Sequence, residues 1–208
     1  MEQLTGLVIL MFSAILHEVA HGYVADRFGD PTARLAGRLT LDPRPHIDLF
    51  MTILLPLSLI LSGSPIIFGG AKPVPIDPFN LKEGRKDVAL VALVGPLTNV
   101  LLAIAAALLF RSLSAIPIMF PAFIGWFLYT VVQYNLLLAI FNLIPIPPLD
   151  GSKVFALLLP EEKANSYLAL GSVGMMILFF LLVFPIGGFS LMSLVSNLLH
   201  FSMSILLP

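Results

Sequence analysis

Hydrophobic residues in this chain are grouped into long blocks separated by short polar stretches. The first block runs from Leu4 to Tyr23 and has roughly the 20 residues with which a helix crosses a bilayer core. Further blocks follow at Leu49 to Phe68, Val88 to Phe110, Ala122 to Asn142 and Ser166 to Phe184, and a last segment repeats Ser193, Asn197, His200 and Ser204 at helical spacing. The pattern predicts an all-α polytopic membrane protein with about five to six membrane segments. The last segment is either a sixth packed helix or an interfacial one.

The second block differs from the others because helix-breaking residues interrupt it. Pro56, Gly63 and Pro65 lie within Leu49 to Phe68, so this segment either spans the membrane or re-enters it. The stretch that follows, from Gly69 to Asn80, is rich in glycine and proline, which predicts an extended loop.

The polar stretch after the first block is the longest in the chain. Residues Arg34 to Leu41 alternate in part between polar and apolar, which predicts a small β-hairpin or strand insertion after the first helix. Such an insertion is either a plain extramembrane hairpin or an exposed edge that pairs with an extended peptide. Four arginines in this stretch favour a cytoplasmic location by the positive-inside rule.

Composition narrows the class of protein. The 208 residues are 58% hydrophobic and only 11% charged, whereas soluble domains carry about 25% charged residues. A formal net charge of -1 argues against nucleic acid as a partner, and the absence of cysteine excludes thiolate metal ligands. We therefore expect a single membrane-embedded domain over residues 1–208, with the lipid bilayer as its surroundings and no nucleic-acid partner. The composition sets no oligomeric state.

Ionisable side chains occur inside the first apolar block, in the sequence HEVAH. His17 and His21 are four residues apart, so a helix places them on one face, within reach of one metal ion. Glu18 lies beside them and can take a proton from water that the metal activates. A chance occurrence is the alternative, but ionisable groups in a membrane segment are costly and are usually functional.

A catalytic zinc site usually takes three protein ligands and a water, so HEVAH requires a partner from elsewhere in the chain. The helix that ends near Asn142 is followed by LIPIPPLDG, whose prolines break it and place Asp150 just past the break. Broken helices at membrane depth line functional cavities. Asp48 and Asp77 are weaker candidates, because they lie in turn-rich loops where a capping role is usual. The expected metal ligands are therefore His17, His21 and Asp150.

Together the motifs of this chain resemble a known family. The chain has HEVAH in an apolar helix, AGRLTLDP and GGAKPVPIDP between helices, GPLTN opening a helix and FNLIPIPPLDG near a later one. Jointly these motifs are similar to the site-2 protease family of intramembrane zinc metalloproteases. The likeness is to its compact prokaryotic branch, which has no PDZ or CBS domain. These motifs extend from Leu16 to Lys153 and so cover most of the chain.

The resemblance implies a function and a set of site residues. It implies that His17, His21 and Asp150 bind one zinc ion, that Glu18 is the catalytic acid and base, and that Asn142 and Pro148 position substrate. The expected substrates are transmembrane proteins, cut within or near their membrane helices. The expected location is the cell membrane, as a multi-pass protein.

Two other functions are compatible with parts of the pattern. A catalytically inert relative would bind transmembrane helices without cutting them, although every expected chemical position carries a competent residue. An ion or solute transporter would also contain broken helices and buried acids. His46, in the polar stretch, is either a group that supports the site residues or an interface residue, and the interface role is favoured.

Overall fold

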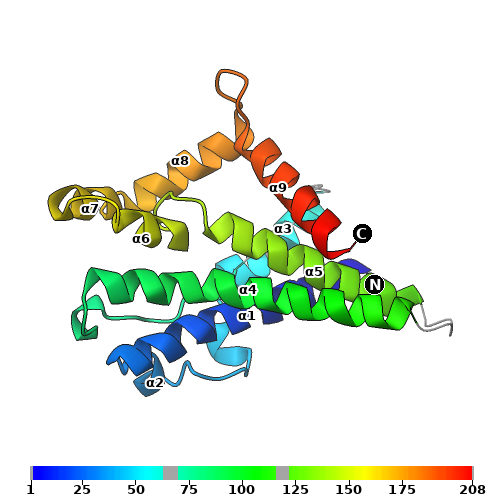
Figure 1. Cartoon of the computed structure of the whole chain (residues 1–208), viewed down its shortest axis with the longest axis horizontal. Coiled ribbons are helices and arrows are strands. Elements are labelled where there is room, and N and C mark those ends of the chain that lie inside the picture. The colour runs from blue at the N-terminus through cyan, green and yellow to red at the C-terminus, as the bar shows by residue number, and fades with distance from the viewer. Residues whose placement is uncertain (1, 63–69, 116–121, 208) are drawn as a thin grey trace. The chain divides into compact units, whose positions relative to one another are not determined.

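The structure is a computed structural model that describes residues 2–62, 70–115 and 122–207. It divides into two compact units, Met1–Asp87 and Val88–Pro208, and each is described by itself. The described residues are mostly helical, which confirms the predicted α class (Figure 1). The predicted interruption at Gly63 and Pro65 lies outside the described residues, and the single domain stays a prediction.

The first unit is built on one long helix. Helix α1, Glu2–Phe28, has 27 residues and ends where Gly29 adopts a φ of +114°, a conformation that favours glycine. The remaining elements of the unit are short: α2 (Thr32–Leu35), the 3₁₀ helices η1 (Arg44–His46) and η3 (Pro78–Asn80), a π-helical stretch η2 (Leu49–Leu54), and α3 (Leu55–Leu61). The functional residues of this unit are therefore arranged around α1.

The predicted strand over Arg34–Leu41 is wrong, because these residues contain a helical turn and bends and no strand. Asp30 accepts a hydrogen bond of 3.1 Å from the backbone N–H of Thr32, which starts the helical turn of α2. Gly37, with a φ of +65°, ends it, and the chain then bends. Local turn formation therefore prevails over the weak alternation in the sequence.

The described part of the second apolar block is short. Segments η2 and α3 have 6 and 7 residues, and the block continues into residues 63–69, outside the described part. Whether this block spans or re-enters the membrane stays a prediction. The segment 70–77 that follows has neither helix nor strand, as its prolines predict.

Two long helices form the centre of the second unit. Helix α4, Arg85–Ser114, begins just before the unit boundary, and α5, Ala122–Asn142, has the bounds that the sequence predicts. Asn99 donates a hydrogen bond of 2.9 Å to Asn135, and both are buried. The apolar core around this pair consists of Ala103, Ala106, Ala107, Leu128, Val132, Leu136 and Met203.

The C-terminal part of the second unit has four shorter helices: α6 (Asp150–Ala156), α7 (Glu161–Leu168), α8 (Gly171–Val183) and α9 (Leu191–Leu206) (Figure 1). The predicted continuous helix over Ser166–Phe184 is wrong, because α7 and α8 are bent by 68° at the break between them. Gly171 adopts a φ of +22° there, which a regular helix does not allow. Helix α9 packs against α5 through Met203, so it is a packed helix.

Three helices within the described residues are long and apolar enough to cross a membrane: Leu4–Phe28, Arg85–Ser114 and Ala122–Asn142. The number rises to four if the bent pair α7 and α8 forms one span. The predicted total of five to six membrane segments is not confirmed.

Candidate metal centre

Helix α1 brings the two predicted histidine ligands together. His17 and His21 are buried, and their Nε2 atoms lie 3.0 Å apart. The ring planes cross at 89° with centroids 4.6 Å apart, so the same nitrogen of each ring points at a common place. This arrangement follows from the four-residue spacing, which puts both side chains on one face of the helix.

The geometry of the histidine pair can be compared with what zinc requires. Two nitrogen ligands at about 2.0–2.1 Å from a tetrahedral zinc lie about 3.3 Å from each other. The observed separation of 3.0 Å between the Nε2 atoms is close to that value. His17 and His21 therefore fit two of the ligand positions of a zinc site.

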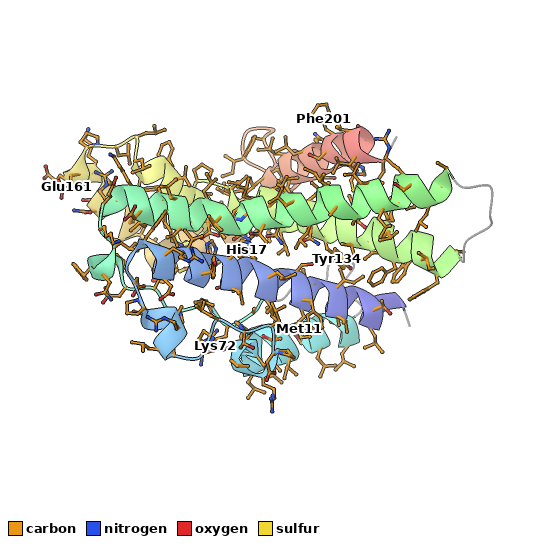
Figure 2. The ribbon with its side chains drawn as sticks, turned by 60° about the horizontal axis from the view of Figure 1, so that its bottom comes forward. Met11, His17, Lys72, Tyr134, Glu161 and Phe201 are labelled. Atoms are coloured by element: carbon orange, nitrogen blue, oxygen red, sulfur yellow. The ribbon has the colours of Figure 1, made fainter. Side chains whose placement is uncertain are left out.

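Glu18 is held in place by the backbone of a distant segment. Its Oε2 atom accepts a hydrogen bond of 2.8 Å from the backbone N–H of Val74, which is 56 residues away in the chain. Figure 2 shows this neighbourhood, with His17 on α1 and Lys72 on the segment that contains Val74. A carboxylate has two oxygens, so Oε1 can still exchange a proton with water.

Two residues that the sequence pattern did not single out as functional hold that segment. Arg38 is buried, and its Nη2 atom donates hydrogen bonds to the carbonyl oxygens of Lys72 and Pro73, at 2.6 and 3.2 Å. His46, expected to be an interface residue, is only 1% exposed, and its carbonyl oxygen accepts a bond of 2.7 Å from Lys72 N–H. These contacts join residues more than 25 positions apart, so no local motif predicts them.

Asp30 anchors the far end of the same segment. Its carboxylate accepts hydrogen bonds from the backbone N–H of Asp77, at 2.7 Å, and from the side-chain amide of Asn80, at 3.0 Å. Burial raises the pKa of Asp30, but the hydrogen bonds from Thr32, Asn80 and Asp77 lower it by more, so the pKa lies below its ordinary value of 3.8. The charged form of this carboxylate therefore stabilises the first unit.

The third predicted ligand belongs to the second unit. Asp150 is buried at the first position of α6, and Lys153 donates a bond of 2.9 Å to its Oδ1 atom. The turn before it approaches α6 closely, since a Cβ atom on Gly151 would lie 2.2 Å from the carbonyl oxygen of Leu143. Only glycine fits at that distance. The assignment of Asp150 as a metal ligand stays a prediction.

The other predicted site residues are placed as follows. Asn142 is the last residue of α5, and its side chain donates to the carbonyl oxygen of Leu138 at 3.1 Å. Pro148 lies in the turn between α5 and α6. Asp48 and Asp77 each accept a hydrogen bond of 3.0 Å from the backbone N–H two residues later, which confirms the expected turn and capping roles.

Comparison with known protein families identifies the family of this chain. The peptidase family M50 matches residues 5–120 and 117–185. The chain belongs to peptidase family M50. This is the site-2 protease family that the motifs resemble, so that prediction is confirmed.

Curated M50 relatives come from bacteria and archaea and are named as zinc metalloproteases. YwhC of Bacillus subtilis is 36% identical over 189 residues, which cover 89% of this chain and 83% of the relative. Rip2 of Mycobacterium tuberculosis H37Rv is 33% identical over 83% of this chain, which spans 63% of that relative. MJ0611 of Methanocaldococcus jannaschii is 32% identical over 72% of this chain and 68% of the relative. No solved structure matches the chain.

Membership of M50 establishes the class of enzyme. The chain is a zinc-dependent metalloprotease of the site-2 type, as the HEVAH motif predicts. Its long apolar helices identify it as a membrane protein. Neither alternative function, the inert relative or the transporter, is favoured by the family.

Proposed function

We propose that this M50 protein is an intramembrane zinc metalloendopeptidase that cuts transmembrane proteins within or near their membrane helices. The observation that carries the proposal is the histidine pair itself. Nε2 atoms of His17 and His21 converge to 3.0 Å on Leu4–Phe28, a helix long and apolar enough to cross a membrane. A metal-ligand pair on such a helix supports hydrolysis at membrane depth, since buried ionisable groups are costly without a role.

The proposed metal site holds one zinc ion per chain. His17 and His21 supply two ligands from α1, and Asp150 supplies the third from the start of α6. When bound, zinc supplies Lewis-acid chemistry, which polarises a carbonyl group and makes water more acidic. Lys153, which donates to Asp150 Oδ1, offsets the charge of this carboxylate and orients it.

Glu18 is the proposed acid and base. The bond from Val74 N–H fixes Oε2, which leaves Oε1 to take a proton from the attacking water and to return it to the leaving amine. Asn142 would donate its side-chain amide to the developing oxyanion, and Pro148 would hold the substrate backbone. Asn142 now donates to Leu138, so this role requires its side chain to turn.

The proposed substrates are membrane proteins with a helix that can unwind. A peptide bond inside a helix is hydrogen-bonded and shielded, so the helix must open before the bond can reach the site. Glycine or proline in the substrate helix lowers the cost of that opening. We place the enzyme in the cell membrane as a multi-pass protein, with the bilayer and its single-span substrates as partners.

The experiment that tests this function uses the variant Glu18→Gln. We expect the purified variant to keep wild-type zinc content and thermal stability but to lose cleavage of a helical substrate by at least about 10²–10⁴-fold, the usual contribution of a general acid or base. The measurement combines metal analysis, a thermal unfolding curve and gel-based cleavage in detergent or vesicles. Undiminished cleavage by Glu18→Gln would remove Glu18 from the mechanism.

A further inference from the structure

Segment 70–77 is hydrogen-bonded to other segments of the first unit at several backbone positions. Thr52 donates its hydroxyl to Gly70 O at 2.6 Å, and Lys72 N–H donates to His46 O at 2.7 Å. Asp30 accepts the N–H of Asp77 at the other end, at 2.7 Å. A chain without helix or strand thus gains fixed positions from contacts with other segments, which satisfy its polar backbone groups.

Arg38 and Glu18 contact opposite ends of the same peptide group in this segment. The carbonyl of Pro73 and the N–H of Val74 belong to one planar trans peptide and point in opposite directions. Arg38 donates to that carbonyl at 3.2 Å, and Glu18 accepts from that N–H at 2.8 Å. Because the plane is rigid, the guanidinium on one side determines where the N–H points on the other.

Packing against α1 fixes the remaining freedom of this peptide group. Val74 is 6% exposed, and its Cγ1 atom lies 2.8 Å from where a Cβ on Gly22 would be. Gly22 is four residues after Glu18, so both lie on one face of the helix. The Val74 side chain is therefore seated against the same face that carries the carboxylate.

We propose that Arg38 is a positioning residue for proteolysis. Its guanidinium sets the plane of the Pro73–Val74 peptide, and the N–H of Val74 then holds Glu18 Oε2. Because the carboxylate is fixed at Oε2, the direction in which Oε1 points for proton transfer is fixed as well. The inference rests on the proposed role of Glu18 as acid and base. Arg38 lies in the AGRLTLDP motif, to which the sequence assigned no chemical role, and its buried guanidinium acts through charge-assisted hydrogen bonds.

The test compares Arg38→Met with Val74→Pro, which removes the N–H and leaves the arginine in place. We expect each variant to lower kcat by roughly 10- to 100-fold, which is part of the rate contribution of the acid and base, with KM and zinc content unchanged.

The double variant should have a kcat little lower than that of either single variant, because both substitutions act through one hydrogen bond. Arg38→Lys keeps a hydrogen-bond donor and should have a kcat between those of the wild type and Arg38→Met. If Arg38→Met folds poorly, the comparison of Arg38→Lys with the wild type still tests the role. Arg44→Ala, an exposed arginine paired with Asp42, is the matched control.

Hydrogen exchange gives a readout that does not depend on cleavage. In the zinc-free protein, Arg38→Met should speed exchange of the backbone amides of Lys72 and Val74, whereas Arg44→Ala should not. Wild-type kcat for Arg38→Met, or effects of Arg38→Met and Val74→Pro that multiply, would overturn the positioning role alone. A wild-type chain that binds zinc but cuts no helical substrate would overturn the proposed function, and the positioning role with it.

Discussion

The two units hold their site residues by different means. In the first unit, polar side chains fix the backbone beside Glu18: Arg38, His46 and Asp30 all bond to segment 70–77 or its end. In the second unit, the turn before Asp150 is fixed by close backbone approach. Cβ atoms on Gly151 and Gly174 would lie 2.2 and 2.1 Å from backbone carbonyl oxygens. The stability of the first unit should therefore depend on pH and on the charge of these side chains. The stability of the second unit should depend on the size of the side chain at these glycine positions.

The largest effect should come from adding one methyl group in the second unit. Gly151→Ala would place a Cβ atom 2.2 Å from Leu143 O, and backbone must move to make room. We expect a loss of about 2–3 kcal/mol in unfolding free energy and a fall in cleavage, because the start of α6 carries Asp150. Denaturant unfolding and a cleavage assay measure both.

The control for that variant is Gly70→Ala in the first unit, where an added Cβ meets nothing within 4 Å. It should change the unfolding free energy by no more than about 0.5 kcal/mol. Wild-type stability and cleavage in Gly151→Ala would show that close approach does not hold the turn.

A smaller effect should follow acidification of the first unit. The pKa of Asp30 is lowered in the folded chain, so its contribution to stability is complete above the ordinary value of 3.8 and is lost as pH falls through the folded value. Asp30→Asn should destabilise the protein by about 1 kcal/mol near pH 7. The difference in unfolding free energy between the two proteins should stay constant from pH 7 to about pH 4 and should shrink as pH falls further. A constant gap would contradict the contribution of the charged carboxylate.

The smallest change in stability should come from Gly22→Ala. The added Cβ would lie 2.8 Å from side-chain atoms of Leu39 and Val74 and 2.9 Å from the Cβ atom of Ala33. Alanine favours the helix by roughly 1 kcal/mol, which offsets part of the cost of these contacts. Cleavage should still fall several-fold, because Val74 must shift away from Glu18. A cleavage assay and an unfolding curve of the same variant test this. A stable variant with full activity would show that the packing of Val74 against Gly22 does not affect catalysis.

The same contrast explains what the sequence could predict. The histidine pair depends on a four-residue spacing within one helix, and α5 is bounded as its flanking prolines predict, so local pattern was sufficient. Arg38 and His46 contact a segment more than 25 residues away, which no local pattern reveals. The strand predicted over Arg34–Leu41 failed because the chain forms the helical turn α2 there, beside a local hydrogen bond from the Thr32 N–H to Asp30.

The zinc site is tested most directly by measuring zinc in purified wild-type, His17→Ala and Asp150→Ala proteins, with Asp42→Ala, a half-buried aspartate paired with Arg44, as control. The account predicts one zinc per chain in the wild type and control, with zinc and cleavage lost from both other variants, since a three-ligand site does not survive removal of one ligand at ordinary metal concentrations. Full zinc content and full cleavage in Asp150→Ala would contradict it.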